Sequence, residues 1–169
     1  ARSTWADSSI FGKPHGTEYD SDATSDTTVG NTDGVTIYYE HETGVNQIKA
    51  GSSSAIAASI ESGDFDISAV QGGGADLRGD GEYIMKIRRV LPDFLQQTGD
   101  ARVTLNLKNY PTDSQASSSL GPFTSSTTTD KIDTRARARA ISLKVDNTST
   151  GQHWKLGTFR LDIQPDGRR

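Results

Sequence analysis

Hydrophobic and polar residues alternate along much of the chain, a pattern that predicts β-strands. The clearest example is 102–108, where Val103, Leu105 and Leu107 share one face and polar side chains occupy the other. The same period of two predicts strands at 35–42, 83–90, 134–145 and 153–163, and two short strand pieces between 55 and 67. Because no long helical pattern separates these segments, we expect an all-β fold, an antiparallel β-sandwich of about six to eight strands with long polar loops.

Segments without this alternation are expected to connect the strands. Residues 1–34 are rich in Asp, Ser, Thr and Gly and are interpreted as an irregular acidic arm or loop region. Residues 35–169 then form the β-sandwich domain. The run 112–129 predicts a long polar loop in which Leu120 and Phe123 are the anchors.

The last predicted strand changes its hydrophobic face partway along. Trp154 and Leu156 share one parity, whereas the hydrophobic residues of 159–163 share the other. A switch of this kind needs an extra residue, and Gly157 is the expected position of a bulge. A single helical turn is predicted at 93–99.

Composition narrows the class of protein. Ser and Thr contribute 38 of the 169 residues and Gly a further 17, which suits turns and solvated β-surfaces better than helices. The absence of cysteine excludes a disulfide scaffold, a Cys-ligated zinc site and thiol catalysis. No apolar run reaches the roughly 18 residues of a membrane span, and no signal-peptide pattern is present. We therefore expect a soluble single-domain protein without membrane contact.

Charge is unevenly distributed along the chain. Residues 1–129 carry 9 Lys/Arg and 17 Asp/Glu, a net charge of −8, whereas residues 130–169 carry 9 and 5, a net charge of +4. This segregation fits either two solvated surfaces of opposite sign or an interface that joins them.

The most unusual feature is the sequence TRARARAISLKV at 134–145. In an extended strand, Arg135, Arg137 and Arg139 project from one face at intervals of about 7 Å. The same face becomes apolar at Ile141. The strand is therefore expected either to leave the core partway along or to contain a bulge that changes its register.

Three guanidinium groups in a row present forked donors that suit carboxylate or phosphate. One interpretation pairs them with carboxylates of the same chain, such as Asp130, Asp133 and the acids of the first half. The other makes them a contact surface for an acidic partner, either a neighbouring subunit or nucleic acid. The acidic overall charge and the lack of interleaved aromatic residues weigh against nucleic acid.

Patterns that would indicate catalysis or metal binding are weak. The histidines His15, His41 and His153 lie in three separate segments, and neither a nucleophile elbow nor a phosphate-binding loop is present, so we expect no enzyme, no cofactor and no small-molecule substrate. Two oxygen-rich segments suit calcium, although a solvated acidic turn is the favoured interpretation of both. Their residues are Asp76, Asp80 and Glu82, and Asp20, Asp22 and Asp26. The tripeptide Arg-Gly-Asp at 78–80 is interpreted as a chance occurrence.

The C-terminal segments KIDTRARARAISLKV and WKLGTFRLDIQPDGRR resemble the closing region of tail proteins from short-tailed bacteriophages. In that family an Arg-rich strand precedes a Trp-x-Leu-Gly turn, an Arg-x-Asp strand and a terminal Pro-Asp-Gly. The matching residues are Arg135, Arg137, Arg139, Trp154, Leu156, Gly157, Arg160, Asp162, Pro165, Asp166 and Gly167. ESGDFDIS at 61–68, GDGEYIMKIRRVLPDF at 79–94 and GPF at 121–123 are also similar. The likeness covers 60–169, whereas the glycine run at 72–74 and the acidic first 46 residues depart from it.

This resemblance implies a non-enzymatic virion structural protein, a component of the tail hub, nozzle or packaged-DNA-stabilising plug. It also implies the C-terminal region of a longer, ring-forming polypeptide. The expected partners are copies of the chain and other tail proteins, close to packaged DNA, and the expected location is the phage tail after assembly in the bacterial cytoplasm. Arg135, Arg137 and Arg139 would then form the subunit interface, and the matching residues from 154 to 167 would be structural.

Two other functions remain open at this point. A carbohydrate-binding or receptor-binding β-sandwich would use Trp5, Trp154 and the tyrosines as stacking faces. A polysaccharide hydrolase would use two carboxylates in a groove, and many carboxylates in solvated loops are available for that role.

Overall fold

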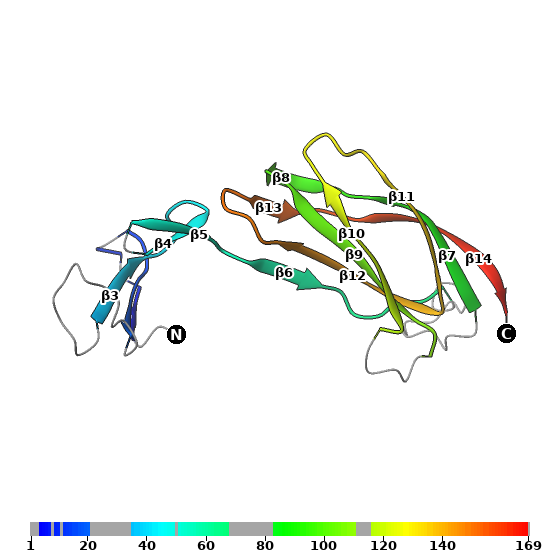
Figure 1. Cartoon of the computed structure of the whole chain (residues 1–169), viewed down its shortest axis with the longest axis horizontal. Helices are drawn as coiled ribbons and strands as arrows, with labels where there is room; N and C mark the ends of the chain where they lie inside the picture. Colours follow the sequence, from blue (N-terminus) through cyan, green and yellow to red (C-terminus); the bar gives the residue numbers. More distant parts are fainter. Residues whose placement is uncertain are drawn as a thin grey trace. The chain divides into compact units, whose positions relative to one another are not determined.

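The computed structural model describes residues 4–7, 9–10, 12–20, 35–49, 51–67, 83–110 and 116–168. In these ranges every regular element is a β-strand, so the predicted all-β class is confirmed. The chain divides into two compact units, residues 1–44 and residues 45–169. Figure 1 shows the strands of each unit.

The N-terminal unit is a three-stranded antiparallel sheet in the order β1-β2-β3. Its strands are β1 (Thr4–Ala6), β2 (His15–Asp20) and β3 (Val35–Glu40). β3 confirms the strand predicted from alternation at 35–42. β2 pairs with β3 over its whole length, from His15↔Glu40 to Asp20↔Val35, and this pairing places the division between the units after residue 44 rather than after residue 34.

The irregular arm predicted for residues 1–34 is corrected by β1 and β2, which lie within it. Both strands are short and carry few hydrophobic residues, so their cross-strand pairing, and not their own pattern, makes them strands. A loop was predicted for the Asp-rich run. Residues 21–34 of this run lie outside the described residues.

The C-terminal unit is built on two antiparallel sheets, ordered β10-β9-β12-β6 and β11-β7-β14. Together they contain seven strands, in agreement with the predicted sandwich. The strands are β6 (Ala58–Glu61), β7 (Tyr83–Leu91), β9 (Ala101–Lys108), β10 (Ser118–Ser125), β11 (Ile132–Ala138), β12 (Ala140–Asn147) and β14 (Arg160–Arg168). Two further pairs complete the unit: β4 (Asn46–Lys49) with β5 (Ser52–Ala55), and β8 (Phe94–Thr98) with β13 (His153–Leu156).

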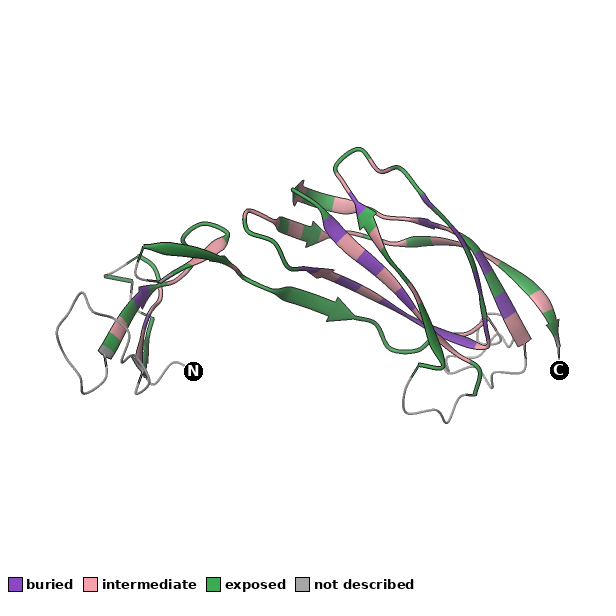
Figure 2. Ribbon diagram, in the orientation of Figure 1, coloured by how far each residue is buried: buried purple, intermediate pink, exposed green. Residues whose placement is uncertain are grey.

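The hydrophobic core lies between the two larger sheets. One sheet contributes alternate residues of β9 and β12, and the other contributes alternate residues of β7 and β11, so buried bands recur along these strands (Figure 2). The buried members are Met85, Ile87, Val90, Ala101, Val103, Leu105, Ile132, Ala136, Ala138, Ile141, Leu143 and Val145. The inward position predicted for Val103 and Leu105 is confirmed, since both are fully buried.

Two long chain segments pass from one sheet to another through a short break. β7 and β8 are separated at residues 92–93, and β13 and β14 at residues 157–159. At the second break the backbone N–H of Gly157 donates to the carbonyl oxygen of Asp93 at 2.8 Å, which joins the two interrupted strands. The change of hydrophobic face predicted at Gly157 therefore coincides with a change of sheet.

Two local predictions are wrong. The single helical turn expected at 93–99 is strand β8, because its residues pair with β13. The polar loop expected at 112–129 contains strand β10, which pairs with β9 although Ser and Thr dominate its sequence. Leu120 and Phe123 do pack against the core, as expected of its anchors.

The predicted pair of short strands between 55 and 67 is confirmed in part. β6 covers 58–61, and Phe65 forms an isolated bridge with Ile141 of β12.

Candidate functional site

The arginine row lies on the exposed side of β11. Thr134, Ala136 and Ala138 point into the core, whereas Arg135 and Arg137 are exposed. Between β11 and β12 the chain leaves one sheet and enters the other at Arg139, so the hydrophobic parity changes and Ile141 is buried. The sequence left two explanations for the apolar face that begins at Ile141, and the one that holds is that the chain changes its surroundings partway along. A separate register shift lies earlier on β11, between Asp133 and Ala136.

Strand register brings a second group of cations next to this row. In the β11–β7 pair, Arg137 lies opposite Lys86 and Asp133 lies opposite Arg89. Arg88 lies between these two positions on β7 and is exposed. Like Arg135 on β11, it lies at the register shift between the pairs Asp133↔Arg89 and Ala136↔Ile87. These residues were not among those predicted for the site, although the run Lys-Ile-Arg-Arg at 86–89, between buried Met85 and Val90, is a signal in the sequence that marks them.

Strand β14 completes the surface on the other side of β7. Its outward positions carry Arg160, Asp162 and Asp166, and Asp162 pairs with Arg89 in register. We call the outer side of the sheet β11-β7-β14 the basic face. Among the side chains that the structure describes there, with Lys131 beside Asp133 included, seven cations stand against three carboxylates, namely Lys86, Arg88, Arg89, Lys131, Arg135, Arg137 and Arg160 against Asp133, Asp162 and Asp166.

Ion pairs within the chain use part of this charge. Arg89 Nε lies 2.9 Å from Asp133 Oδ1, and Lys131 Nζ lies 3.7 Å from Asp133 Oδ2. The hydrogen bond from Arg89, helped by Lys131, lowers the pKa of the Asp133 carboxyl. Arg137 Nε lies 2.5 Å from Asp166 Oδ2. The intrachain interpretation therefore holds for Arg137, but its partner is Asp166 rather than Asp130 or Asp133.

Four cations of the basic face form no ion pair with a described carboxylate, namely Lys86, Arg88, Arg135 and Arg160. Arg88 and Arg135 form no ion pair with any carboxylate in the part of the chain that the structure describes. Their guanidinium groups therefore remain available as donors to another molecule.

The outer side of the opposite sheet differs in its charge balance. Arg102 pairs with Asp146, and Lys108 Nζ lies 2.5 Å from Asp64 Oδ2. Glu61 Oε1 accepts hydrogen bonds from Asn106 at 2.6 Å and from Ser142 at 2.8 Å. These hydrogen bonds, with that of Ser142 foremost, lower the pKa of the Glu61 carboxyl. Charges on this side are thus matched within the chain, so of the two larger sheets of the C-terminal unit, as far as they are described, β11-β7-β14 is the one with a surplus of cations on its outer side.

The lowered pKa of Glu61 predicts an acid-dependent loss of stability. A carboxylate whose pKa is lower in the folded than in the unfolded state stabilises the fold above the unfolded pKa, near 4.3, and this contribution disappears as the pH falls through the folded pKa. Glu61→Gln is therefore expected to be less stable than wild type at about pH 6, with a difference that shrinks toward about pH 3. Urea unfolding midpoints at both pH values test this, and a difference that does not change with pH contradicts it.

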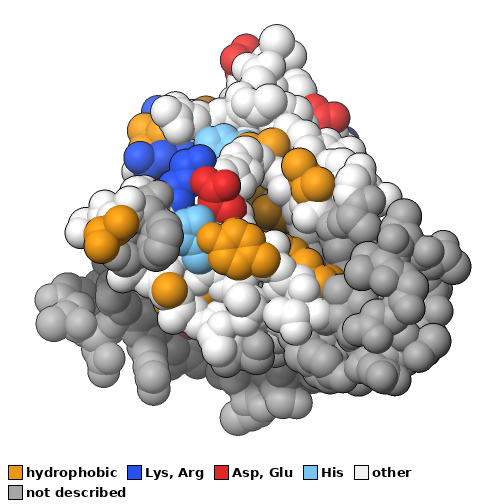
Figure 3. Space-filling model, turned by 90° about the vertical axis from the view of Figure 1, so that its left-hand side faces the viewer, with side chains coloured by type: hydrophobic (Ala, Val, Ile, Leu, Met, Phe, Trp, Pro, Cys, Tyr) orange, Lys and Arg blue, Asp and Glu red, His pale blue; other side chains and the backbone are white. Residues whose placement is uncertain are grey.

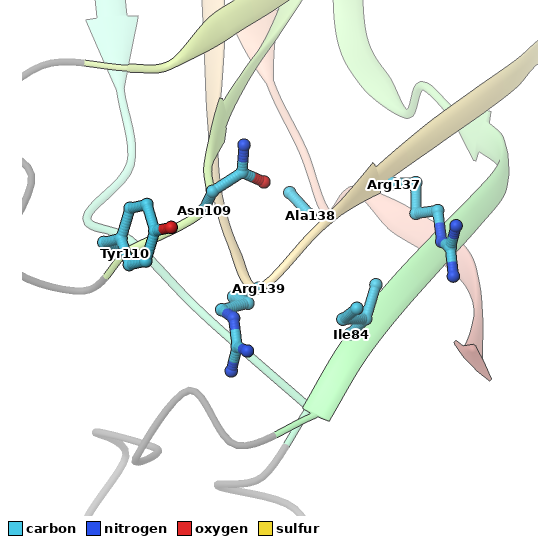
Figure 4. Close-up of a pocket in the computed structure, with 6 residues that line it drawn as sticks. All are labelled: Ile84, Asn109, Tyr110, Arg137, Ala138 and Arg139. Atoms are coloured by element: carbon cyan, nitrogen blue, oxygen red, sulfur yellow. The ribbon is translucent and has the colours of Figure 1, made fainter. Parts of the chain in front are cut away.

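A cavity of about 370 Å³ lies at the edge of the basic face, where β11 ends. Arg137, Ala138 and Arg139 line it together with Ile84, Asn109 and Tyr110. In Figure 4 the guanidinium groups of Arg137, on β11, and of Arg139, in the break between β11 and β12, extend in the same direction in the view. A hollow that joins two guanidinium groups, an amide and a phenol has the chemistry to take a carboxylate or phosphate oxygen.

The remaining residues matched by the phage resemblance lie on β13, β14 and the break between them. Trp154 packs edge-on against Phe94, with ring centroids 6.3 Å apart, and its Nε1 donates to Asn147 Oδ1 at 3.0 Å. Leu156 pairs with Phe94, and Gly157 bonds to Asp93 as described above. Pro165 lies opposite Met85, and Gly167 has a positive φ of 104°.

The two tryptophans expected as stacking faces for carbohydrate binding belong to different units and differ in exposure. Trp154 is half-buried, with its indole N–H already bonded, whereas Trp5 in the N-terminal unit is 57% exposed. The Trp5 ring lies 4.5 Å from that of His41, measured between centroids. Trp5 is therefore the tryptophan that retains an open face.

The residues considered for metal binding and catalysis are described only in part. Among the described residues, no group of three or more His, Cys, Asp or Glu side chains has the spacing to hold a metal ion. His15 stacks on Tyr38 and His41 lies against Trp5 in the N-terminal unit, whereas His153 belongs to β13 of the other unit. Asp22, Asp26, the Arg-Gly-Asp at 78–80, Asp76 and Glu82 lie outside the described residues, as does the side chain of Asp20.

Comparisons with known proteins add no assignment. No protein-family model matches the chain, and a search of curated proteins finds no match. Within the described ranges, no helix is long and apolar enough to cross a membrane. The function must therefore be argued from the basic face itself.

Proposed function

We propose that the chain is a non-enzymatic structural module that assembles by docking the acidic surface of a neighbouring subunit onto its basic face. The supporting observation is the charge of that face, seven cations against three carboxylates, beside a matched set of charges on the opposite sheet. The resemblance of the C-terminal segments to tail proteins of short-tailed bacteriophages supports a place in a virion tail, in a hub-like or nozzle-like ring. Neighbouring tail proteins and packaged DNA are then the other molecules close to it.

The physical role of the basic face in this proposal is to guide and orient the contact. Opposite charges on two surfaces accelerate encounter and fix the relative register of the subunits, while apolar and backbone contacts supply most of the binding free energy. Charge pairs that become buried lose hydration, which offsets much of their attraction. No reacting group is required for such a role.

Reversing one unpaired charge on the basic face tests this proposal. Arg135→Glu is expected to raise the protein concentration at half-assembly by about tenfold, because a carboxylate there repels the acidic partner. The fold is expected to persist, since Arg135 is exposed and pairs with no described carboxylate. Analytical ultracentrifugation measures assembly, and circular dichroism checks the β-fold.

Lys155→Glu is the matched control, because Lys155 is an exposed cation on β13, a strand that is not part of the sheet β11-β7-β14. It makes the same change of net charge and is expected to assemble like wild type. Equal assembly of Arg135→Glu and Lys155→Glu contradicts the proposed role of the basic face. A wild-type chain that stays monomeric at micromolar concentration contradicts self-assembly altogether.

A carbohydrate-binding or receptor-binding module is the second candidate function. The open ring of Trp5 supports it, because an exposed indole next to polar groups is a common stacking platform for sugars. Binding of wild type, but not of Trp5→Ala, on a glycan array favours this candidate over assembly. Absence of binding leaves the structural module as the better account.

A further inference from the structure

The two units of the chain differ strongly in charge. Residues 1–44 carry two Lys/Arg and eight Asp/Glu, a net charge of −6, whereas residues 45–169 carry sixteen and fourteen, a net charge of +2. The basic face belongs to the second unit. The chain therefore contains its own acidic counterpart to the basic face in a separate compact unit. Every copy of the chain supplies one acidic unit and one basic face.

The N-terminal unit also lacks a hydrophobic core of its own in its described residues. Tyr39 is the one large hydrophobic residue buried there, whereas Trp5 is 57% exposed and Tyr38 is 63% exposed. Register places Trp5 and Tyr39 on one side of the sheet and Tyr38 on the other. A three-stranded sheet with aromatic rings exposed on both sides is only marginally stable alone and gains from a partner that covers one side.

The side chains of this unit include carboxylates and aromatic rings, with which guanidinium groups interact favourably. Figure 3 looks onto the N-terminal unit and shows hydrophobic, acidic and histidine side chains gathered together, with Lys and Arg side chains beside them. Of the acids there, Glu40 is paired with Lys13. Arginine pairs with carboxylates through forked hydrogen bonds and stacks on aromatic rings. The unpaired Arg88 and Arg135 of the basic face would find both kinds of acceptor on this unit.

We propose that the partner of the basic face is the acidic N-terminal unit, residues 1–44, of another copy of this chain. The inference rests on the proposed function and identifies the surface that the neighbouring subunit contributes. Because the two surfaces differ, the contact is heterologous, and copies join head to tail. Such a chain of contacts closes into a ring when the rotation between copies divides a full turn, and otherwise forms a filament.

Nucleic acid is the competing occupant of the basic face. Asp133 and Asp166 already pair with Arg89, Lys131 and Arg137, so the cations left without a described partner are separate groups rather than a continuous track for a run of phosphates. This distribution favours a protein partner that carries separate carboxylates and aromatic rings.

Complementary charge reversal tests the proposal in the full-length chain. Arg88→Glu/Arg135→Glu reverses the basic face, and Asp7→Lys/Glu42→Lys reverses two exposed acids of the N-terminal unit. Each double variant alone is expected to need at least about tenfold more protein for half-assembly than wild type. An equimolar mixture of the two is expected to assemble near the wild-type concentration, because each reversed surface then meets a reversed partner.

The matched control for the acidic side is Asp93→Lys/Asp100→Lys, two exposed acids of the C-terminal unit with the same change in net charge. It is expected to assemble like wild type and not to restore assembly of Arg88→Glu/Arg135→Glu. Circular dichroism of every variant confirms that the β-fold is retained.

The outcomes separate this inference from the proposed function. If Arg88→Glu/Arg135→Glu loses assembly while Asp7→Lys/Glu42→Lys keeps it, the basic face is an interface but its partner is not residues 1–44. If a fluorescein-labelled DNA oligonucleotide binds wild type but not Arg88→Glu/Arg135→Glu, and assembly is unchanged, nucleic acid is the occupant and the inference is wrong. A mixture that does not recover assembly also overturns it.

Discussion

Replacing Leu105 by Ala is expected to lower the free energy of unfolding of the C-terminal unit by about 3 kcal/mol. Leu105 is fully buried on β9, where it lies opposite Leu120 of β10 and Leu143 of β12. Truncation removes its apolar surface and leaves a cavity between the two sheets, and both effects reduce stability. Denaturant unfolding followed by tryptophan fluorescence measures the change, since Trp154 packs against the same core.

Leu95→Ala is the control for this prediction. Leu95 lies on β8, the strand that precedes β9 in the sequence, and is 66% exposed, so the same truncation there removes little packing. Its effect is expected to stay within about 0.5 kcal/mol. Similar effects at Leu95 and Leu105 would show that the core does not lie between the two sheets.

Gly157→Val is expected to destabilise the C-terminal unit by about 2–3 kcal/mol. A Cβ atom on Gly157 would stand 2.6 Å from the carbonyl oxygen of Asp93, and this contact is to backbone, which cannot rotate away. The side chain must therefore push the two strand breaks apart, which also strains the 2.8 Å hydrogen bond between Gly157 and Asp93. The unfolding midpoint in urea measures the loss.

Gly63→Val separates this steric effect from the general cost of replacing glycine. An added Cβ at Gly63 meets nothing within 4 Å, so little destabilisation is expected there. If Gly157→Val were as stable as Gly63→Val, the close approach of the two breaks would not be a feature of the folded protein.

The local alternation of the sequence was sufficient to predict the strands with hydrophobic faces. Val103 and Leu105 on β9 and Met85 and Ile87 on β7 follow a strict period of two, and all four are fully buried. The change of hydrophobic parity at Gly157 was also visible in the sequence, but the bulge predicted there within one strand is wrong, because the chain breaks between β13 and β14 and changes sheet. Strands β8 and β10 were missed, since Ser, Thr and Gln at exposed positions carry no such pattern and only pairing with β13 and β9 makes them strands.

The candidate site was predictable only in part. Arg135 and Arg137 stand in a row because a strand alternates, and this follows from the sequence alone. Their neighbours Lys86 and Arg88 lie far from them in sequence, and the register between β11 and β7 brings them to one surface. The pairing of Arg137 with Asp166 depends in the same way on where β14 ends.

The sequence by itself thus determined the all-β class, the inward faces of the main strands and the exposed arginine row, because side-chain direction in a strand depends only on position along it. Tertiary structure decided which strands become neighbours, where residues 1–44 separate from the rest, and how isolated cations combine into one basic face. These depend on hydrogen bonds and packing between segments distant in sequence, whose free energy no single segment contains.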